Sequence, residues 1–164
     1  MKTVLLVCTG NTCRSAMAGA ALRHLLSQRQ VRGVEVRSAG LMAMPGDTMP
    51  PYAHLALSQL GIAPGDHRAR LLDAEEMAGA DFIVAMTKRH ARDILDRFPE
   101  AATKTRTLLS FAGVTADVSD PIGGSSERYV HCLQIMMMGL EGLIKALTQP
   151  APKHGKATAK PPPA

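Results

Sequence analysis

A cysteine and an arginine near the start of the chain have the spacing of a catalytic phosphate-binding turn. Cys8 and Arg14 have five residues between them, and Ser15 follows the arginine directly. An apolar run at residues 4–7 precedes the cysteine, and residues with helical periodicity follow the serine. A turn from a strand into a helix points backbone N–H groups inward and lies at the positive end of the helix dipole. The spacing therefore predicts a phosphate cradle with a nucleophile at its centre.

The chemistry of such a turn requires a thiolate. A cysteine attacks only in this form, and an ordinary thiol pKa of about 8.5 leaves little of it at neutral pH. Loop amides, a helix N-terminus and a guanidinium bring cysteine pKa values to roughly 3.5–7.5 in comparable sites. We therefore expect Cys8 to attack, Arg14 to bind two phosphate oxygens and Ser15 to donate a hydrogen bond to the sulfur. The other members of the expected phosphate-binding loop are Thr9, Gly10, Asn11, Thr12 and Cys13.

Three other interpretations of this pattern are weaker. A structural cysteine beside an unrelated arginine leaves unexplained the glycine and asparagine at positions that favour left-handed backbone. A zinc site on Cys8 and Cys13 lacks a second pair of ligands with metal-like spacing, and the neighbouring guanidinium would repel a cation. The turn also lacks the Gly-Lys-Ser/Thr ending of a nucleotide-binding P-loop. We expect no metal and no other cofactor.

The turn and several later segments resemble the low-molecular-weight protein tyrosine phosphatases, whose signature is C-x5-R-S directly after the first strand. Residues 38–40, residues 67–70, the expected strand at 81–86 and the Ser-Asp-Pro at 119–121 look like family landmarks in the family's order. The likeness runs from about residue 1 to residue 147. It implies a phosphatase that acts on phosphorylated proteins through a phosphocysteine intermediate. It also implies that Ser38 and His67 support the loop through side-chain hydrogen bonds.

Asp120 is the candidate acid of this reaction. Neither a phenolate nor a deprotonated guanidine leaves easily, because the parent groups have pKa values of about 10 and above 12. Asp120 precedes Pro121 in a loop with glycines nearby, so the loop can approach the mouth of the site. An Asp-Pro pair alone is more often a simple turn, and it is the family resemblance that assigns the acid role. Asp120 would protonate the leaving group and then, as a carboxylate, activate the water that hydrolyses the phosphocysteine.

Two features favour phosphoarginine over phosphotyrosine as the substrate. Thr12 and residues 120–124 look like the protein arginine phosphatase branch, whereas tyrosine-selective members carry a bulky aliphatic residue at the first position and an aromatic pair in the second segment. Residues 41–45 offer methionines rather than Trp or Tyr, so stacking partners for a phenyl ring are scarce. A protein tyrosine phosphatase on the same scaffold is the alternative. An arsenate reductase would need further cysteines between Cys13 and Cys132, and a silent phosphate-binding module would lack the nucleophile or the acid.

Cys13 adds a redox prediction. An accessible thiolate of low pKa is the form of cysteine that peroxide oxidises first, and Cys13 lies in the same turn as Cys8. Cys13 would then trap the sulfenic acid as a disulfide. The alternative is that Cys13 only packs in the core.

Alternating strands and helices are expected to position these residues. The expected strands cover residues 4–7, 34–37, 81–85 and 106–109. The expected helices contain residues 17–26, 52–60, 88–98 and 126–147, with a further helix start at a capping box of Asp73 and Glu76 and a helix cap at Thr87. This order predicts a three-layer, doubly wound α/β fold: a four-stranded parallel sheet with helices on both faces and its ligand beyond the carboxyl ends of the strands.

The composition fits a small cytoplasmic enzyme. A chain of 164 residues suits one domain, expected at residues 1–149, with a core of Leu, Val, Met and Ala because only 3% of the residues are aromatic. The apolar run after Met1 is too short for a signal peptide or a membrane span. Three cysteines argue against a secreted disulfide framework. We expect a monomer whose partners are phosphorylated proteins, with no membrane contact.

Residues 150–164 consist largely of Pro, Lys, Ala and Thr without apolar periodicity, which predicts a disordered tail. The tail carries three of the formal +5 charges and leaves about +2 on the rest. Nucleic-acid binding is not expected, because no basic stripe alternates with aromatic residues. The basic residues at 88–92 are interpreted as a solvated helix face.

Overall fold

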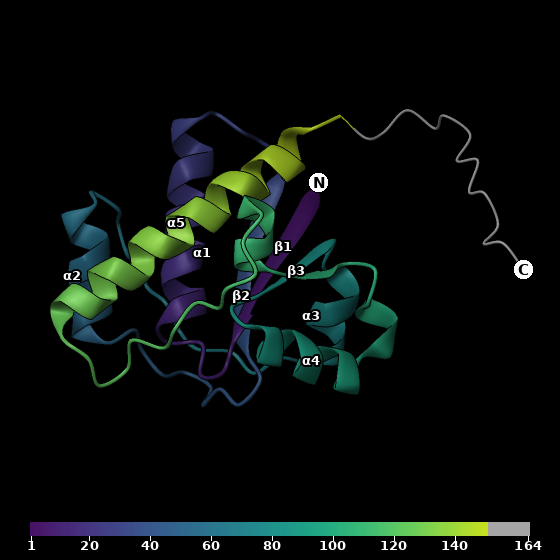
Figure 1. Cartoon of the computed structure of the whole chain (residues 1–164), viewed down its shortest axis with the longest axis horizontal. Coiled ribbons are helices and arrows are strands. Elements are labelled where there is room, and N and C mark those ends of the chain that lie inside the picture. The colour runs from purple at the N-terminus through teal and green to yellow at the C-terminus, as the bar shows by residue number, and fades with distance from the viewer. Residues whose placement is uncertain (151–164) are drawn as a thin grey trace, which may run out of the picture.

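Within residues 1–150, which the computed structural model describes, four parallel strands form one sheet in the order β2, β1, β3, β4. Figure 1 shows three of these strands, β1, β2 and β3, among the helices. The strands are β1 (Lys2–Cys8), β2 (Val34–Gly40), β3 (Phe82–Ala85) and β4 (Thr105–Thr107). The two inner strands, β1 and β3, are mostly buried apolar residues, as expected for strands that are covered on both faces. The predicted four-stranded parallel sheet is confirmed.

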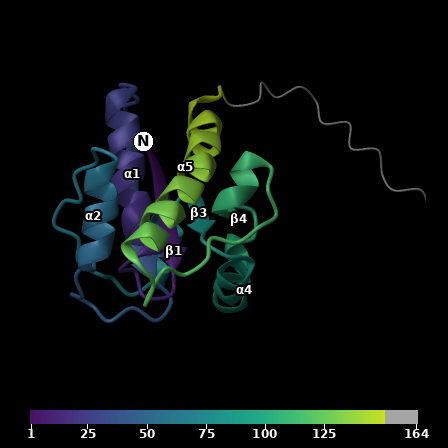
Figure 2. The same cartoon turned by 60° about the vertical axis from the view of Figure 1, so that its left-hand side comes forward.

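Helices cover both faces of this sheet. Figure 2 shows α1, α2 and α5 on one side and α4 on the other. The helices are α1 (Arg14–Gln28), α2 (Pro51–Gln59), α3 (Ala74–Gly79), α4 (Lys88–Arg97) and α5 (Ser126–Thr148), with short 3-10 helices η1 (Pro99–Ala101) and η2 (Leu108–Ala112).

Alternate side chains of β1 enter the two cores between these layers. Val4, Leu6 and Cys8 pack into the larger core with α1, α2 and α5. Leu5 and Val7 pack into the smaller core with α3 and α4. Because successive strand residues point to opposite faces, one continuous apolar run fills both cores. The predicted doubly wound, three-layer arrangement is therefore confirmed.

The fourth strand differs from its predicted bounds. β4 ends at Thr107, and Leu108 and Leu109 begin η2 instead of extending the strand. Both leucines are buried in the core that contains α5. α5 can approach η2 closely because Gly142 has no side chain. A Cβ at this position would collide with the carbonyl of Phe111. Leu108 and Leu109 form an apolar pair because they pack against α5. A short apolar run does not distinguish a strand from a buried helical turn, so the predicted strand was too long.

The predicted capping box at α3 forms only in part. Oδ1 of Asp73 accepts from the N–H of Glu76 at 2.8 Å, as predicted. The Glu76 carboxylate does not return to Asp73 but pairs with the guanidinium of Arg70 at 2.5 Å. The predicted cap of α4 is confirmed, because Oγ1 of Thr87 accepts from the N–H of His90 at 3.0 Å.

α5 is, by length and composition, the one helix of the described residues that could span a membrane. Its buried side chains pack against α1, α2 and η2 in the larger core. Its place in this core accounts for its apolar character. The tail predicted at residues 150–164 lies, from residue 151 onward, outside the described residues.

Candidate active site

The predicted phosphate-binding loop, residues 8–15 and called the phosphate loop below, joins the carboxyl end of β1 to α1. Cys8 is the last residue of β1 and Arg14 is the first residue of α1. Both are nearly buried, Cys8 at 3% and Arg14 at 7% exposure. A pocket of about 160 Å³ at this loop is lined by Cys8, Thr9, Gly10, Thr12, Cys13, Arg14, Asp120 and Ile122. The structure thus brings Cys8, Arg14 and Asp120 together in one pocket.

The hydrogen-bond partners of Asn11 and Ser15 leave the Ser15 proton available to Cys8. The main-chain N–H of Arg70 donates to Oδ1 of Asn11 at 2.9 Å, which identifies the other terminal atom of the Asn11 amide as nitrogen. That nitrogen donates to Oγ of Ser15 at 2.8 Å. Because the Ser15 oxygen accepts this bond, its own proton is free to point at Sγ of Cys8, 2.9 Å away. The main-chain N–H of Asn11 lies 3.3 Å from the same sulfur. Both donors stabilise negative charge on the sulfur.

Asn11 is held in the phosphate loop by contacts to both its side chain and its main chain. It is fully buried and has φ of 55°, a left-handed geometry that asparagine tolerates better than most residues. Nε2 of His67 lies 2.6 Å from the Asn11 carbonyl. Because a carbonyl can only accept, Nε2 carries a proton whatever the charge of the ring. Burial lowers the pKa of His67, which favours the neutral ring. His67 therefore contacts the phosphate loop.

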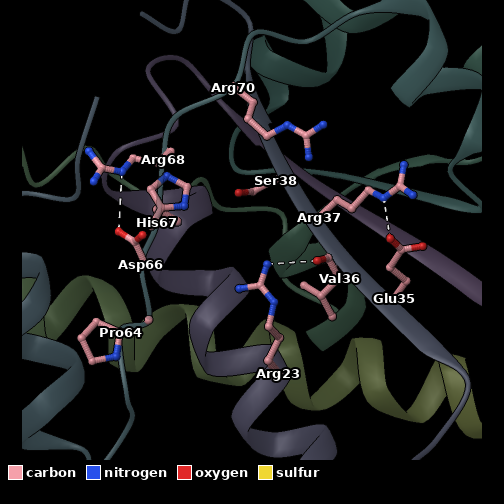
Figure 3. A pocket seen from close by; sticks show the side chains of 12 residues that line it. Arg23, Glu35, Val36, Arg37, Ser38, Pro64, Asp66, His67, Arg68 and Arg70 are labelled. Atoms are coloured by element: carbon pink, nitrogen blue, oxygen red, sulfur yellow. Dashed lines mark hydrogen bonds and ion pairs between the residues drawn. The ribbon is translucent and has the colours of Figure 1, made fainter. Parts of the chain in front are cut away.

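Ser38 occupies a different position from the one its predicted role requires. It is 7% exposed and lies in β2, where it pairs with Leu6 of β1. Within residues 1–150 its hydroxyl makes no hydrogen bond to the phosphate loop; Asn11 of that loop is contacted instead by the His67 ring and by the main-chain N–H of Arg70. It lines a second, larger pocket on the outer side of β2 (Figure 3).

Arg14 connects the phosphate loop to the segment that carries Asp120. Nη1 of Arg14 donates to the carbonyl of Val118 at 3.0 Å, and Nη2 lies 3.5 Å from Oδ2 of Asp120. The Asp120 side chain is 46% exposed. Its Oδ1 accepts from the N–H of Ile122 at 3.0 Å, which fixes the turn around Pro121. A solvent-accessible carboxylate held beside the guanidinium can exchange a proton with a bound group or with water.

His90 is part of the site, and its assignment to a solvated helix face is wrong. It is 6% exposed, and its Nε2 lies 2.8 Å from Oγ1 of Thr9 in the phosphate loop. Burial, together with the nearby charge of Arg14, lowers the pKa of His90 to about 4, so the ring is neutral at pH 7. The sequence held a signal for this position. His90 precedes the fully buried Ile94 by one helical turn and therefore lies on the same face of α4.

All three cysteines of the chain are buried and free. Sγ of Cys13 lies 3.7 Å from the hydroxyl of Tyr129, and burial raises the pKa of the Cys13 thiol. Sγ of Cys132 lies 3.7 Å from the carbonyl of Ser119, and burial raises its pKa to about 12. Across residues 1–150, no group of three or more His, Cys, Asp or Glu side chains is placed to hold a metal ion.

Comparison with known proteins gives consistent matches over this fold. A protein-arginine-phosphatase of Geobacillus stearothermophilus is 45% identical over 127 residues, which cover 77% of this chain and 82% of the relative. The probable low molecular weight protein-tyrosine-phosphatase EpsP of Ralstonia nicotianae is 32% identical over 145 residues, which cover 88% of this chain and 94% of the relative. A solved structure of a YwlE arginine phosphatase mutant, with serine in place of cysteine and a phosphorylated active-site serine, has a TM-score of 0.83. It is 36% identical and covers 91% of this chain and 97% of the other.

The family match includes every residue of the pocket. Residues 3–153 match the profile described as low molecular weight phosphotyrosine protein phosphatase. The matched segment begins inside β1 and extends past the end of α5, so it contains the whole sheet and the phosphate loop. The chain therefore belongs to the low molecular weight phosphotyrosine protein phosphatase family.

Proposed function

We propose that this chain hydrolyses phosphoarginine in proteins through a phosphocysteine intermediate. The observation that carries the proposal is the convergence of Cys8, Arg14 and Asp120 on one pocket. Sγ of Cys8 attacks phosphorus while the bond from phosphorus to the leaving nitrogen breaks. That nitrogen takes a proton from Asp120 as it leaves. The Arg14 guanidinium and the loop amides bind the phosphoryl oxygens throughout.

The second half of the reaction returns the enzyme to its starting state. Asp120, now a carboxylate, takes a proton from water as that water attacks phosphorus. The bond between sulfur and phosphorus breaks, and inorganic phosphate is released. The Ser15 proton, held toward the sulfur by the Asn11 amide, stabilises the departing thiolate. The solved relative with a phosphorylated active-site serine supports a covalent intermediate at this position.

The walls of the pocket support phosphoarginine as the substrate. The side chains of Thr12 and Ile122 border it, and no aromatic ring is among its lining residues within the described part of the chain. Ile122 is 61% exposed and offers flexible aliphatic surface in place of a ring for stacking, and Met42, 74% exposed, lines a neighbouring pocket together with Thr9 and Arg14. The Geobacillus stearothermophilus relative is a protein-arginine-phosphatase, whereas the Ralstonia relative, at lower identity, is a probable low molecular weight protein-tyrosine-phosphatase and supports the alternative substrate.

The test is a comparison of two peptides with the same sequence, one carrying phosphoarginine and one phosphotyrosine, with release of inorganic phosphate as the measurement. We expect a higher kcat/KM for the phosphoarginine peptide. Cys8→Ser should abolish turnover while orthophosphate binding stays measurable, since the loop amides and Arg14 remain. A higher kcat/KM for phosphotyrosine would overturn the substrate assignment, and wild-type turnover by Cys8→Ser would overturn the mechanism.

Asp120→Asn tests the acid role separately. Loss of general acid catalysis should lower the rate on either peptide by roughly 10²- to 10⁴-fold. The loss on para-nitrophenyl phosphate should be smaller, because its leaving group hardly needs a proton. Equal losses on all three substrates would exclude Asp120 as the acid.

A further inference from the structure

A second pocket, called the arginine pocket below, lies between α1, the edge strand β2 and residues 64–70 (Figure 3). Its volume is about 670 Å³, which is within the usual range for small-molecule sites. Four arginines and two carboxylates line it. The arginine pocket therefore has an excess of positive charge. These charged residues are Arg23, Arg37, Arg68, Arg70, Glu35 and Asp66.

Arg23 is the one arginine of this pocket without a carboxylate partner in the described residues. Its Nη2 donates to the carbonyl of Val36 at 3.0 Å, which supplies no counter-charge. Burial lowers the pKa of Arg23, so its guanidinium has lost hydration without gaining an ion pair. In Figure 3 it points into the same space as the Ser38 hydroxyl and the His67 ring. The other pairs are Arg37 with Glu35 at 2.8 Å, Arg68 with Asp66 at 3.5 Å and Arg70 with Glu76 at 2.5 Å.

We propose that the arginine pocket binds a small organic polyanion, with two or more carboxylate or phosphate groups, and that this ligand regulates the phosphate loop. One anionic group pairs with Arg23, whose fork suits a planar carboxylate or a phosphate. The Ser38 hydroxyl donates to the same ligand, which gives this buried serine a partner. Arg70, at the opposite side of the pocket in Figure 3, contacts a second anionic group.

Two residues of the arginine pocket also hold the phosphate loop in place. Nε2 of His67 donates to the Asn11 carbonyl at 2.6 Å, and the N–H of Arg70 donates to Oδ1 of Asn11 at 2.9 Å. Burial first, and the Arg23 charge to a lesser degree, lower the pKa of His67. An anion beside Arg23 offsets that charge and favours protonated His67, a stronger donor to Asn11. Because Asn11 directs the Ser15 proton at Cys8, binding should raise kcat. The effect on turnover rests on the proposed function of the phosphate loop, whereas the binding does not.

Citrate is a suitable probe, and Arg23→Gln and Arg32→Gln are matched variants. Arg32 is exposed and lies outside the pocket, so its replacement makes the same change in net charge. Calorimetry should show citrate binding to the wild type and to Arg32→Gln, with an affinity at least about tenfold lower for Arg23→Gln. In ¹⁵N spectra of the histidine rings, citrate should raise the pKa of His67 in the same two proteins. Their kcat on para-nitrophenyl phosphate should rise with citrate, while that of Arg23→Gln should not.

Each opposing result overturns a defined part of the proposal. Equal citrate affinities in the three proteins would exclude a site at Arg23. Competitive inhibition that is the same in all three would place citrate at the phosphate loop alone and would also exclude this site. Binding that depends on Arg23 but leaves kcat unchanged would refute the regulation and retain the site. Failure of the proposed catalytic mechanism would leave the calorimetric result intact, so the two failures are distinguishable.

Discussion

Asn11→Ala should weaken both the fold and the reaction, by amounts that follow from the contacts of Asn11. The side chain accepts from the Arg70 N–H and donates to Ser15, and both partners lose their bond in the variant. Loss of a hydrogen bond with an unsatisfied partner costs about 1–3 kcal/mol, and left-handed geometry costs alanine about 1 kcal/mol more. Because two such bonds are lost, the free energy of unfolding, measured in urea, should fall by about 3–7 kcal/mol with an unchanged m value.

The same change should lower kcat/KM on para-nitrophenyl phosphate. Without the Asn11 amide, the Ser15 hydroxyl is no longer oriented toward Sγ of Cys8, and a hydrogen bond to a charged group contributes roughly 1.5–3 kcal/mol. This corresponds to a loss of about 10- to 100-fold.

Two control variants separate the contributions. Asn11→Gly removes the same side-chain bonds but accepts positive φ freely, so it should regain about 1 kcal/mol of stability over Asn11→Ala without regaining activity. Gln30→Ala changes the other non-glycine residue that has positive φ within residues 1–150, at 54° and outside the site, and should leave kcat/KM unchanged. An Asn11→Ala enzyme with wild-type stability and kcat/KM would refute the view that Asn11 orients the loop.

Three further predictions concern specificity, oxidation and pH. Thr12→Ile should raise the phosphotyrosine to phosphoarginine activity ratio at least about tenfold, while para-nitrophenyl phosphate turnover reports an intact site; an unchanged ratio would exclude Thr12 from specificity. Peroxide inactivation should be reversed by dithiothreitol in the wild type, and equal recovery by Cys13→Ala would exclude a protective disulfide with Cys8. The unfolded chain protonates His90 near pH 6.5 and the folded chain only near pH 4, so this residue contributes stability that is lost as pH falls from 7 to 4. Unfolding free energies of the wild type and His90→Gln should diverge by about 3 kcal/mol over that interval, and parallel pH profiles would contradict the buried neutral ring.

The catalytic turn could be predicted from the sequence because its parts are contiguous. A strand, a loop and a helix start follow one another over residues 4–17, so spacing alone fixes that Cys8 and Arg14 share one turn. Asp120 differs, because local sequence shows only a possible turn at Asp-Pro. Its approach to Arg14 depends on the chain returning to the loop, and only the family resemblance indicated this.

The residues that shape the turn from outside were harder to predict. His90 was missed because a histidine among basic neighbours suggests a solvated face, and only its spacing from Ile94 indicates burial. The donor from residue 70 to Asn11 is a main-chain N–H, which every non-proline residue has, so no side-chain pattern could identify it. The arginine pocket likewise depends on long-range packing, since Arg23 and His67 come from different elements.

Gly40, which belongs to one of the segments that resemble the family, lies so close to the phosphate loop that a side chain would not fit there. A Cβ at this position would lie 2.5 Å from the carbonyl of Thr9 and 3.0 Å from the N–H nitrogen of Asn11. Any larger residue would have to move the phosphate loop, because both contacts are to its backbone. Gly40 also exchanges main-chain hydrogen bonds with the segment behind the loop, accepting from the N–H of Leu72 at 2.9 Å and donating to the carbonyl of Arg70 at 2.8 Å. The end of β2 is thus the point where the phosphate loop and the segment that carries His67 and Arg70 are held together, and only glycine allows the approach.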